Sequence, residues 1–224
     1  MLRLLVRLFA EQRQYPNALE VLEKGIHDDL ESGNISHRAD KILDRAYIHC
    51  RLGNYEPCLQ DIRASLDLDR SLQRSMSAAT VLGQAAYRNK QSLKKRFVSE
   101  LRSIQSQLPT ETIEPLSDIA KAHVFGEVLL AEGHWSRALA EFNKANRLEA
   151  PMTDKEYLAR ALLASANNTS DETSARELRA QAKAAYSVLA LKPGLVWQWA
   201  RDYFPGYASD SAARAREDSD LPNR

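Results

Sequence analysis

The sequence predicts an all-α protein built from consecutive helical hairpins. Apolar residues recur at intervals of three and four along most of the chain, which places them on one side of a helix. Most of the 8 glycines and 8 prolines fall between these periodic stretches, where they would begin or end helices. No alternation of apolar and polar residues is long enough for a β-strand. We therefore expect helices joined by turns throughout.

Composition narrows the class of protein. With 224 residues, the chain can form one or two domains or a short repeat array. Hydrophobic residues make up 44%, enough to bury a core, so global disorder is not expected. The 31 Lys and Arg residues balance 30 Asp and Glu residues, a net charge of +1, which gives no electrostatic reason to expect nucleic acid or an acidic membrane as a partner.

The N-terminal stretch from Met1 to Ala10 is apolar but short. Arg3 and Arg7 interrupt it, and no small-residue cleavage site follows. These features favour neither a signal peptide nor a membrane span. We expect a cytoplasmic protein without membrane insertion.

The clearest predicted hairpin covers residues 119–152. Its two helices meet at a tight turn around Gly133, and Gly126 lies where the helices would approach each other closely. Small and large apolar residues then follow along one face of the second helix: Trp135, Ala138, Phe142 and Ala145. The alternation of small and large side chains predicts that these two helices pack tightly against each other.

Residues 39–72 repeat the same order. Gly53 takes the turn position, Cys58 the position of Ala138, and Ile62 that of Phe142. Arg45 departs from the pattern, because a leucine is usual there. Between this hairpin and the preceding one, residues 31–38 are expected to form a polar loop.

Three further segments complete the predicted array. The first hairpin covers about residues 1–32, with an apolar stripe at Leu4, Leu5, Leu8 and Phe9. Residues 76–109 are a degenerate hairpin, because the turn glycine is missing and Lys95 stands in the alanine position. Residues 153–193 form a fifth hairpin with a polar loop at 167–173. Residues 195–203 are apolar and are expected to cap the array, whereas 204–224 form a polar, partly disordered tail.

This order of residues resembles the tetratricopeptide repeat (TPR) family, whose period is about 34 residues. The resemblance covers about residues 1–193, is best at 39–72 and 119–152, and is similar to the TPR arrays of bacterial signalling and regulatory proteins. It implies an α-α superhelix in which the first helix of each hairpin lines a concave groove. It also implies binding of a protein or peptide partner in that groove, and often self-association.

The TPR frame implies which side chains the first helices project into the groove: Tyr47, Arg51, Gln84, Tyr87, Arg88, His123, Glu127 and Lys155. Arginine and aromatic residues are enriched at binding hot spots, which suits such a groove. The apolar residues near the C-terminal end, Trp197, Trp199 and Tyr203, are a candidate surface for homo-oligomer assembly.

No motif in the sequence indicates catalysis, a cofactor or a metal. The five histidines form no His pair at i, i+4 spacing, and the pairing of His123 with Glu127 favours a polar helix pair over metal ligands. Cys50 and Cys58 are eight residues apart, which is neither a metal signature nor a disulfide framework, so we expect reduced thiols.

The sequence therefore predicts a non-catalytic interaction scaffold or regulatory module. The alternative is a ligand-sensing helical repeat domain, in which a small molecule bound near Tyr47, Arg51, Tyr87 and Arg88 would regulate an attached or partner protein. An enzyme is the least supported hypothesis, since no catalytic motif is present.

Overall fold

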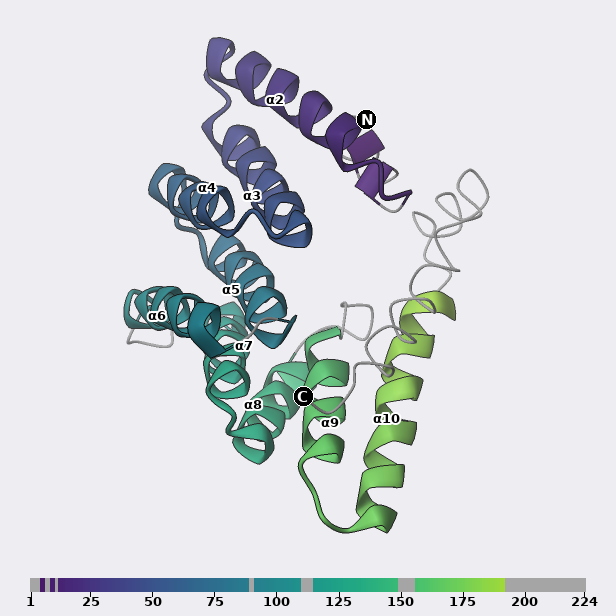
Figure 1. Ribbon diagram of the computed structural model, residues 1–224. Coiled ribbons are helices and arrows are strands. Elements are labelled where there is room, and N and C mark those ends of the chain that lie inside the picture. The colour runs from purple at the N-terminus through teal and green to yellow at the C-terminus, as the bar shows by residue number, and fades with distance from the viewer. Residues whose placement is uncertain are drawn as a thin grey trace. The chain divides into compact units, whose positions relative to one another are not determined.

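The computed structural model describes residues 5–6, 9–10, 12–88, 91–109, 115–148 and 156–191, with only the backbone at a few helix ends. In these residues every regular element is a helix, which confirms the predicted all-α class (Figure 1). The helices are α2 (Tyr15–Glu31), α3 (Ile35–Leu52), α4 (Tyr55–Leu68), α5 (Leu72–Arg88), α6 (Gln91–Ser106), α7 (Pro115–Glu132), α8 (Trp135–Leu148), α9 (Glu156–Asn167) and α10 (Glu172–Leu191).

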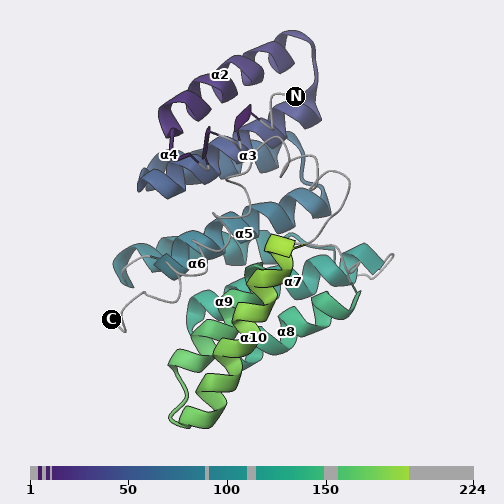
Figure 2. The ribbon, with the colours of Figure 1, turned by 90° about the vertical axis from the view of Figure 1, so that its right-hand side faces the viewer.

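The chain divides into two compact units, Met1–Leu108 and Pro109–Arg224. The first contains the hairpins α3/α4 and α5/α6, with α2 packed on α3, and the second contains α7/α8 and α9/α10. Figure 2 shows the two helices of these hairpins lying side by side. The boundary between the units falls at the end of the degenerate hairpin that the sequence predicted at 76–109.

One type of turn recurs between helices of both units. Gly33, Gly53 and Gly133 follow α2, α3 and α7 with φ angles of 70°, 80° and 90°. Each glycine amide donates to the carbonyl three residues earlier, and the next amide donates to the carbonyl five residues earlier, as from Gly133 to Leu130 and from His134 to Leu129. Glycine suits this left-handed helix cap because it has no Cβ to clash. The predicted turns at Gly53 and Gly133 are confirmed.

In the first unit, the structure corrects one helix boundary and the predicted apolar stripe. The loop predicted at 31–38 is shorter, because α3 already begins at Ile35 after the turn at Gly33. In the N-terminal apolar stripe, Val6 is buried whereas Leu5 is 40% exposed. Val6 packs with three residues of α2 and α3, namely Ala18, Leu22 and Ile48. Which residues of this stretch are buried depends on the face that packs against α2 and α3. Hydrophobicity alone did not identify that face.

Arg74 at the start of α5 joins α5 to α3 and to the end of α4. Its side chain is 5% exposed, and its Nη2 atom donates to Asp40 Oδ1 at 2.6 Å and to the Ser36 carbonyl at 3.1 Å. Its other terminal nitrogen pairs with Asp69, and this hydrogen bond lowers the pKa of the Asp69 carboxyl. A buried guanidinium held by two carboxylates fixes the relative position of the two first helices.

The core of the second unit forms where α7 meets α8. A Cβ atom placed on Gly126 would lie 2.5 Å from Phe142 Cε1, so only glycine admits the Phe142 ring at this position. Ala138 and Ala145 are completely buried on the same face of α8. The close approach that the sequence predicted at Gly126 is therefore confirmed. A second cluster joins α9 to α10 through Ala159, Leu162, Leu163 and Ala182.

None of the described helices is both long and apolar enough to cross a lipid bilayer. Several predicted features lie outside the described residues: the groove residue Lys155, the capping segment 195–203 with Trp197, Trp199 and Tyr203, and the tail 204–224.

Candidate interaction surface

A stripe of partly exposed side chains runs along α3. It consists of Asp40, Asp44, Tyr47 and Arg51, which are spaced by four, three and four residues and so share one side of the helix. Asp40 at one end of the stripe is the residue that contacts Arg74 of α5. The stripe therefore meets α5 at Asp40, and Tyr47 and Arg51, which the sequence places on a first helix, lie about two to three turns further along α3.

A second stripe runs along α5, which is otherwise largely buried. Between Arg74 and Tyr87, the partly exposed residues are Ser77, Thr80, Gln84 and Tyr87. The Ser77 and Thr80 hydroxyls donate to backbone carbonyls one turn earlier, each at 3.0 Å. Gln84 and Tyr87 are therefore the large side chains of this stripe.

We call the two stripes together the α3–α5 surface. Its larger groups are the Asp44 carboxylate, the Arg51 guanidinium, the Gln84 amide and the phenols of Tyr47 and Tyr87. Tyr47 packs against the apolar cluster around Leu22. Arg51, Gln84 and Tyr87 each have a further interaction within the protein. Side chains held in this way lose less conformational freedom on binding than free ones.

The other predicted groove residues are placed differently. Arg88 ends α5, and its side chain is not among those described. His123 and Glu127 lie on α7 in the second unit, but they are 5% and 0% exposed rather than projecting from the helix as the sequence predicted. The repeat frame placed them correctly on a first helix. The frame did not predict the burial of Glu127, because that burial depends on a charged residue of α9 that pairs with it.

That residue is Arg160, which is 2% exposed. Its Nη1 and Nη2 atoms donate to Glu127 Oε2 at 3.0 Å and to Glu127 Oε1 at 2.5 Å, a forked ion pair between α9 and α7. Because both charges are removed from water, the pair is stable only while each neutralises the other. We did not predict this pair from the sequence, although Glu127 is the one carboxylate in the apolar middle of α7.

Aromatic rings surround the ion pair on one side. The His123 ring lies 4.5 Å from the Tyr157 ring and 5.9 Å from the Phe142 ring, both in edge-on arrangements. The Nε2 atom of His123 is 3.9 Å from Glu127 Oε1. Burial, and to a smaller extent the nearby positive charge of Arg160, together lower the pKa of His123 to about 3. His123 is therefore neutral at physiological pH, and this cluster acts as a packed core.

An ion pair joins α3 to α4 near the middle of their hairpin. Arg45 donates from Nε and Nη2 to the two carboxylate oxygens of Asp61, at 2.8 and 2.7 Å. These hydrogen bonds raise the pKa of Arg45. His49 Nε2 lies 3.9 Å from Asp61 Oδ2. The unexpected arginine at position 45 is therefore explained by the acid that faces it from α4.

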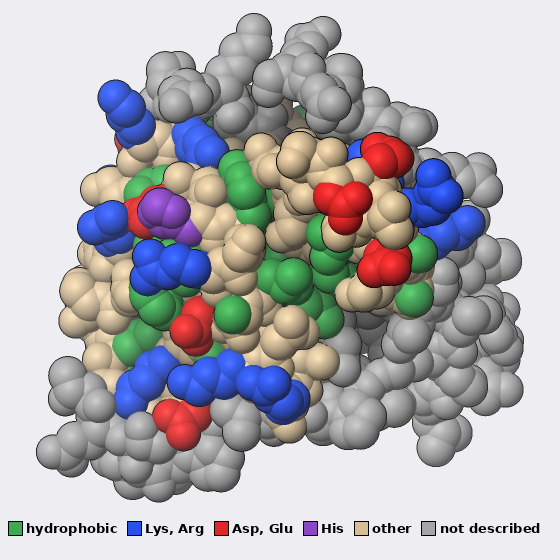
Figure 3. Space-filling view, turned by 90° about the horizontal axis from the view of Figure 1, so that it is seen from below, with side chains coloured by type: hydrophobic (Ala, Val, Ile, Leu, Met, Phe, Trp, Pro, Cys, Tyr) green, Lys and Arg blue, Asp and Glu red, His purple; other side chains and the backbone are tan. Residues whose placement is uncertain are grey.

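On the face shown in Figure 3, the described apolar side chains form separate patches between charged ones. Within the described part of the chain, no group of three or more His, Cys, Asp or Glu side chains could hold a metal ion.

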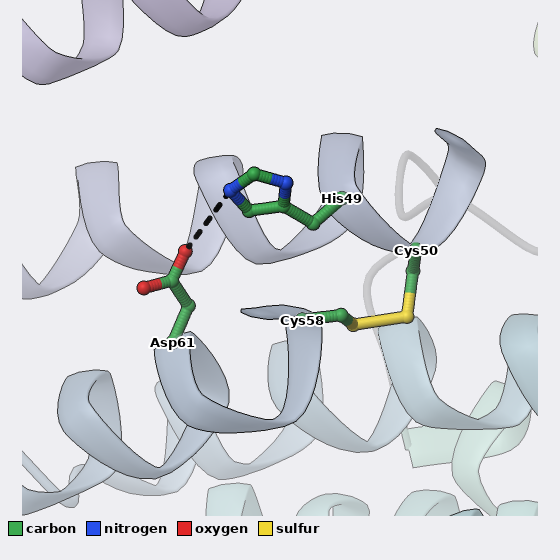
Figure 4. The surroundings of a disulfide bond; sticks show 4 residues. All are labelled: His49, Cys50, Cys58 and Asp61. Atoms are coloured by element: carbon green, nitrogen blue, oxygen red, sulfur yellow. Dashed lines mark ion pairs between the residues drawn. A yellow bond between two sulfur atoms is a disulfide. The ribbon is translucent and has the colours of Figure 1, made fainter. Parts of the chain in front are cut away.

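The cysteines correct the sequence analysis. Cys50 near the end of α3 and Cys58 in α4 form a disulfide, with Cα atoms 5.3 Å apart (Figure 4). The turn at Gly53 folds the two helices back on each other, so residues that flank it come into contact although they are eight apart. The expectation of two reduced thiols was therefore wrong for this structure.

Comparison with protein-family models, with curated proteins and with solved structures found no match.

Proposed function

We propose that this chain is a TPR-like helical repeat module that binds a protein or peptide partner through the α3–α5 surface. The observation that carries the proposal is the pairing of two first helices, α3 and α5, each with one partly exposed stripe. Arg51 and the two tyrosines are residue types enriched at binding hot spots.

The chemistry of the surface indicates what kind of partner would fit. Arg51 near the end of α3 would hold a carboxylate of the partner through forked hydrogen bonds. Gln84 on α5 would pair with backbone groups, and the tyrosine rings would pack against apolar side chains. An extended or helical peptide with an acidic residue next to an apolar one matches this set.

The proposal can be tested by comparing what two double variants capture from a cell extract. Arg51→Ala/Gln84→Ala removes two polar groups of the surface, whereas Arg176→Ala/Gln181→Ala removes the same residue types from exposed positions on α10. We expect a partner that the wild type and the α10 control retain equally and that the α3–α5 variant loses. Equal retention by all three proteins would contradict binding at this surface.

A further inference from the structure

The Cys50–Cys58 disulfide lies beside the α3–α5 surface, because Cys50 is the residue before Arg51. It links the last turn of α3 to the second turn of α4 across the turn at Gly53 (Figure 4). In the corresponding positions around Gly133, the second unit has Leu130 and Ala138, both buried. A covalent bond has thus taken the place of an apolar contact in one hairpin only.

The hairpin has contacts between α3 and α4 other than this bond. Arg45 and Asp61 form a forked ion pair between α3 and α4, and Ser65 Oγ donates to the Ala39 carbonyl at 2.7 Å. These contacts lie at the middle and at the far end of the hairpin from the turn. We therefore expect them to hold the two helices together when the disulfide is reduced.

The last turn of α3 is held less firmly. Leu52 is 42% exposed, so packing contributes little there. Two backbone hydrogen bonds close the turn, from Gly53 N to the Cys50 carbonyl at 3.3 Å and from Asn54 N to the His49 carbonyl at 2.9 Å. Without the disulfide, this turn loses its covalent link to α4, which opposes fraying.

We propose that Cys50 and Cys58 form a reversible thiol–disulfide pair whose state either fixes or loosens the last turn of α3, which carries Arg51. The consequence for partner binding rests on the proposed function, but the redox chemistry does not. In a reducing compartment, a protein disulfide is usually transient and redox-sensing.

Exposure decides how the bond would open. Cys58 is completely buried whereas Cys50 is partly exposed, so a thiolate of a dithiol reductant attacks Sγ of Cys50. The S–S bond breaks, Cys58 leaves as a thiolate and takes up a proton, and a mixed disulfide remains on Cys50. The second thiol of the reductant then attacks the reductant's sulfur in that mixed disulfide. Cys50 is released as a thiol. The dithiol is oxidised to a disulfide as the protein disulfide is reduced to two thiols.

The test uses the full chain without any partner. The protein is treated with oxidised glutathione or with dithiothreitol, free thiols are counted by alkylation and mass measurement, and amide hydrogen exchange is followed in both states. We expect no alkylated cysteine under oxidised glutathione and two under dithiothreitol. Cys50 should be alkylated before Cys58, and the helix content should be the same in both states. After reduction of the disulfide, the amides of Gly53 and Asn54 should exchange at least several-fold faster. The amides of α7 and α8 should exchange at an unchanged rate.

Three results would overturn the proposal: two free thiols under oxidised glutathione, loss of helix content on reduction, or equal amide exchange in the two states. The double variant Cys50→Ser/Cys58→Ser is the control, and its exchange should match the reduced protein under both treatments. Because no partner is present, failure here would leave the binding proposal standing, and failure of the capture experiment would leave the redox pair standing.

Discussion

Glu127 and Arg160 form a buried forked ion pair although they are 33 residues apart in the sequence. Glu127 lies on α7 and Arg160 on α9, so the pair joins the first helices of consecutive hairpins. Asp40 and Arg74, 34 residues apart, join α3 to α5 in the first unit in the same way. In each unit, an acid on one first helix meets an arginine on the next.

Removing one partner of the Glu127–Arg160 pair should destabilise the second unit strongly. Arg160→Met leaves the Glu127 carboxylate buried and uncompensated, which should cost about 3–5 kcal/mol in the free energy of unfolding. Glu127→Met/Arg160→Met removes both charges and should cost clearly less than Arg160→Met alone. Urea unfolding followed by tryptophan fluorescence measures this, because Trp135 is the first residue of α8 in the second unit.

Arg179→Met is a matched control for that series. Arg179 is about half exposed on α10 of the same unit and pairs with Glu172 at the surface. Its replacement should change the unfolding free energy by no more than about 0.5 kcal/mol. A double Met variant as unstable as Arg160→Met would show that the cost comes from lost packing rather than from an uncompensated charge.

Gly126→Ala should destabilise the α7/α8 hairpin by about 1–3 kcal/mol, because the added methyl group overlaps the Phe142 ring. Replacing the Phe142 ring with a smaller side chain tests this cause directly. Phe142→Leu in the Gly126→Ala background should lose less stability than it does in the wild type, as measured by the same urea unfolding. If the two substitutions add without coupling, the close approach at Gly126 is not what limits the site.

The stability of the second unit should fall between pH 7 and pH 5 because of His123. Its pKa is lowered to about 3 in the folded state, so below pH 6.5 the unfolded chain takes up a proton that the folded chain does not. The stabilisation is complete above pH 6.5 and is lost as the pH falls toward 3. At pH 5 the loss should be about 2 kcal/mol.

His123→Gln removes the titrating group from its contacts with Tyr157 and Glu127 and near Arg160. The variant should therefore lose about 2 kcal/mol less than the wild type between pH 7 and pH 5, whatever its stability at pH 7. Urea unfolding at the two pH values provides the comparison. Parallel losses in the two proteins would mean that another group is responsible.

Local patterns in the sequence predicted the helices and the turns well. Positive φ angles require glycine at positions 53 and 133, and the Phe142 ring requires glycine at position 126. The sequence pattern had indicated a turn at the first two positions and a close helix approach at the third. Contacts between hairpins were predicted less well. The burial of Glu127 depends on its partner Arg160. The two residues come together only because α9 packs on α7.

The cysteines show the same limit at shorter range. The spacing of Cys50 and Cys58 matched no disulfide framework, and only the geometry of the turn at Gly53 brings them together. Arg45 had also looked like a defect in the repeat, whereas it pairs with Asp61 of the facing helix. Single positions that depart from a repeat are best explained by the helix that faces them.

The most direct test of the account is quantitative capture of partners by the wild type, by Arg51→Ala/Gln84→Ala and by Arg176→Ala/Gln181→Ala. Circular dichroism should first show the same helix content in all three proteins, since the substituted side chains are partly or fully exposed. The account predicts at least one protein that the wild type and the α10 variant capture equally and that the α3–α5 variant captures at least ten-fold less. Equal capture by all three would place binding elsewhere and contradict the assignment of the α3–α5 surface.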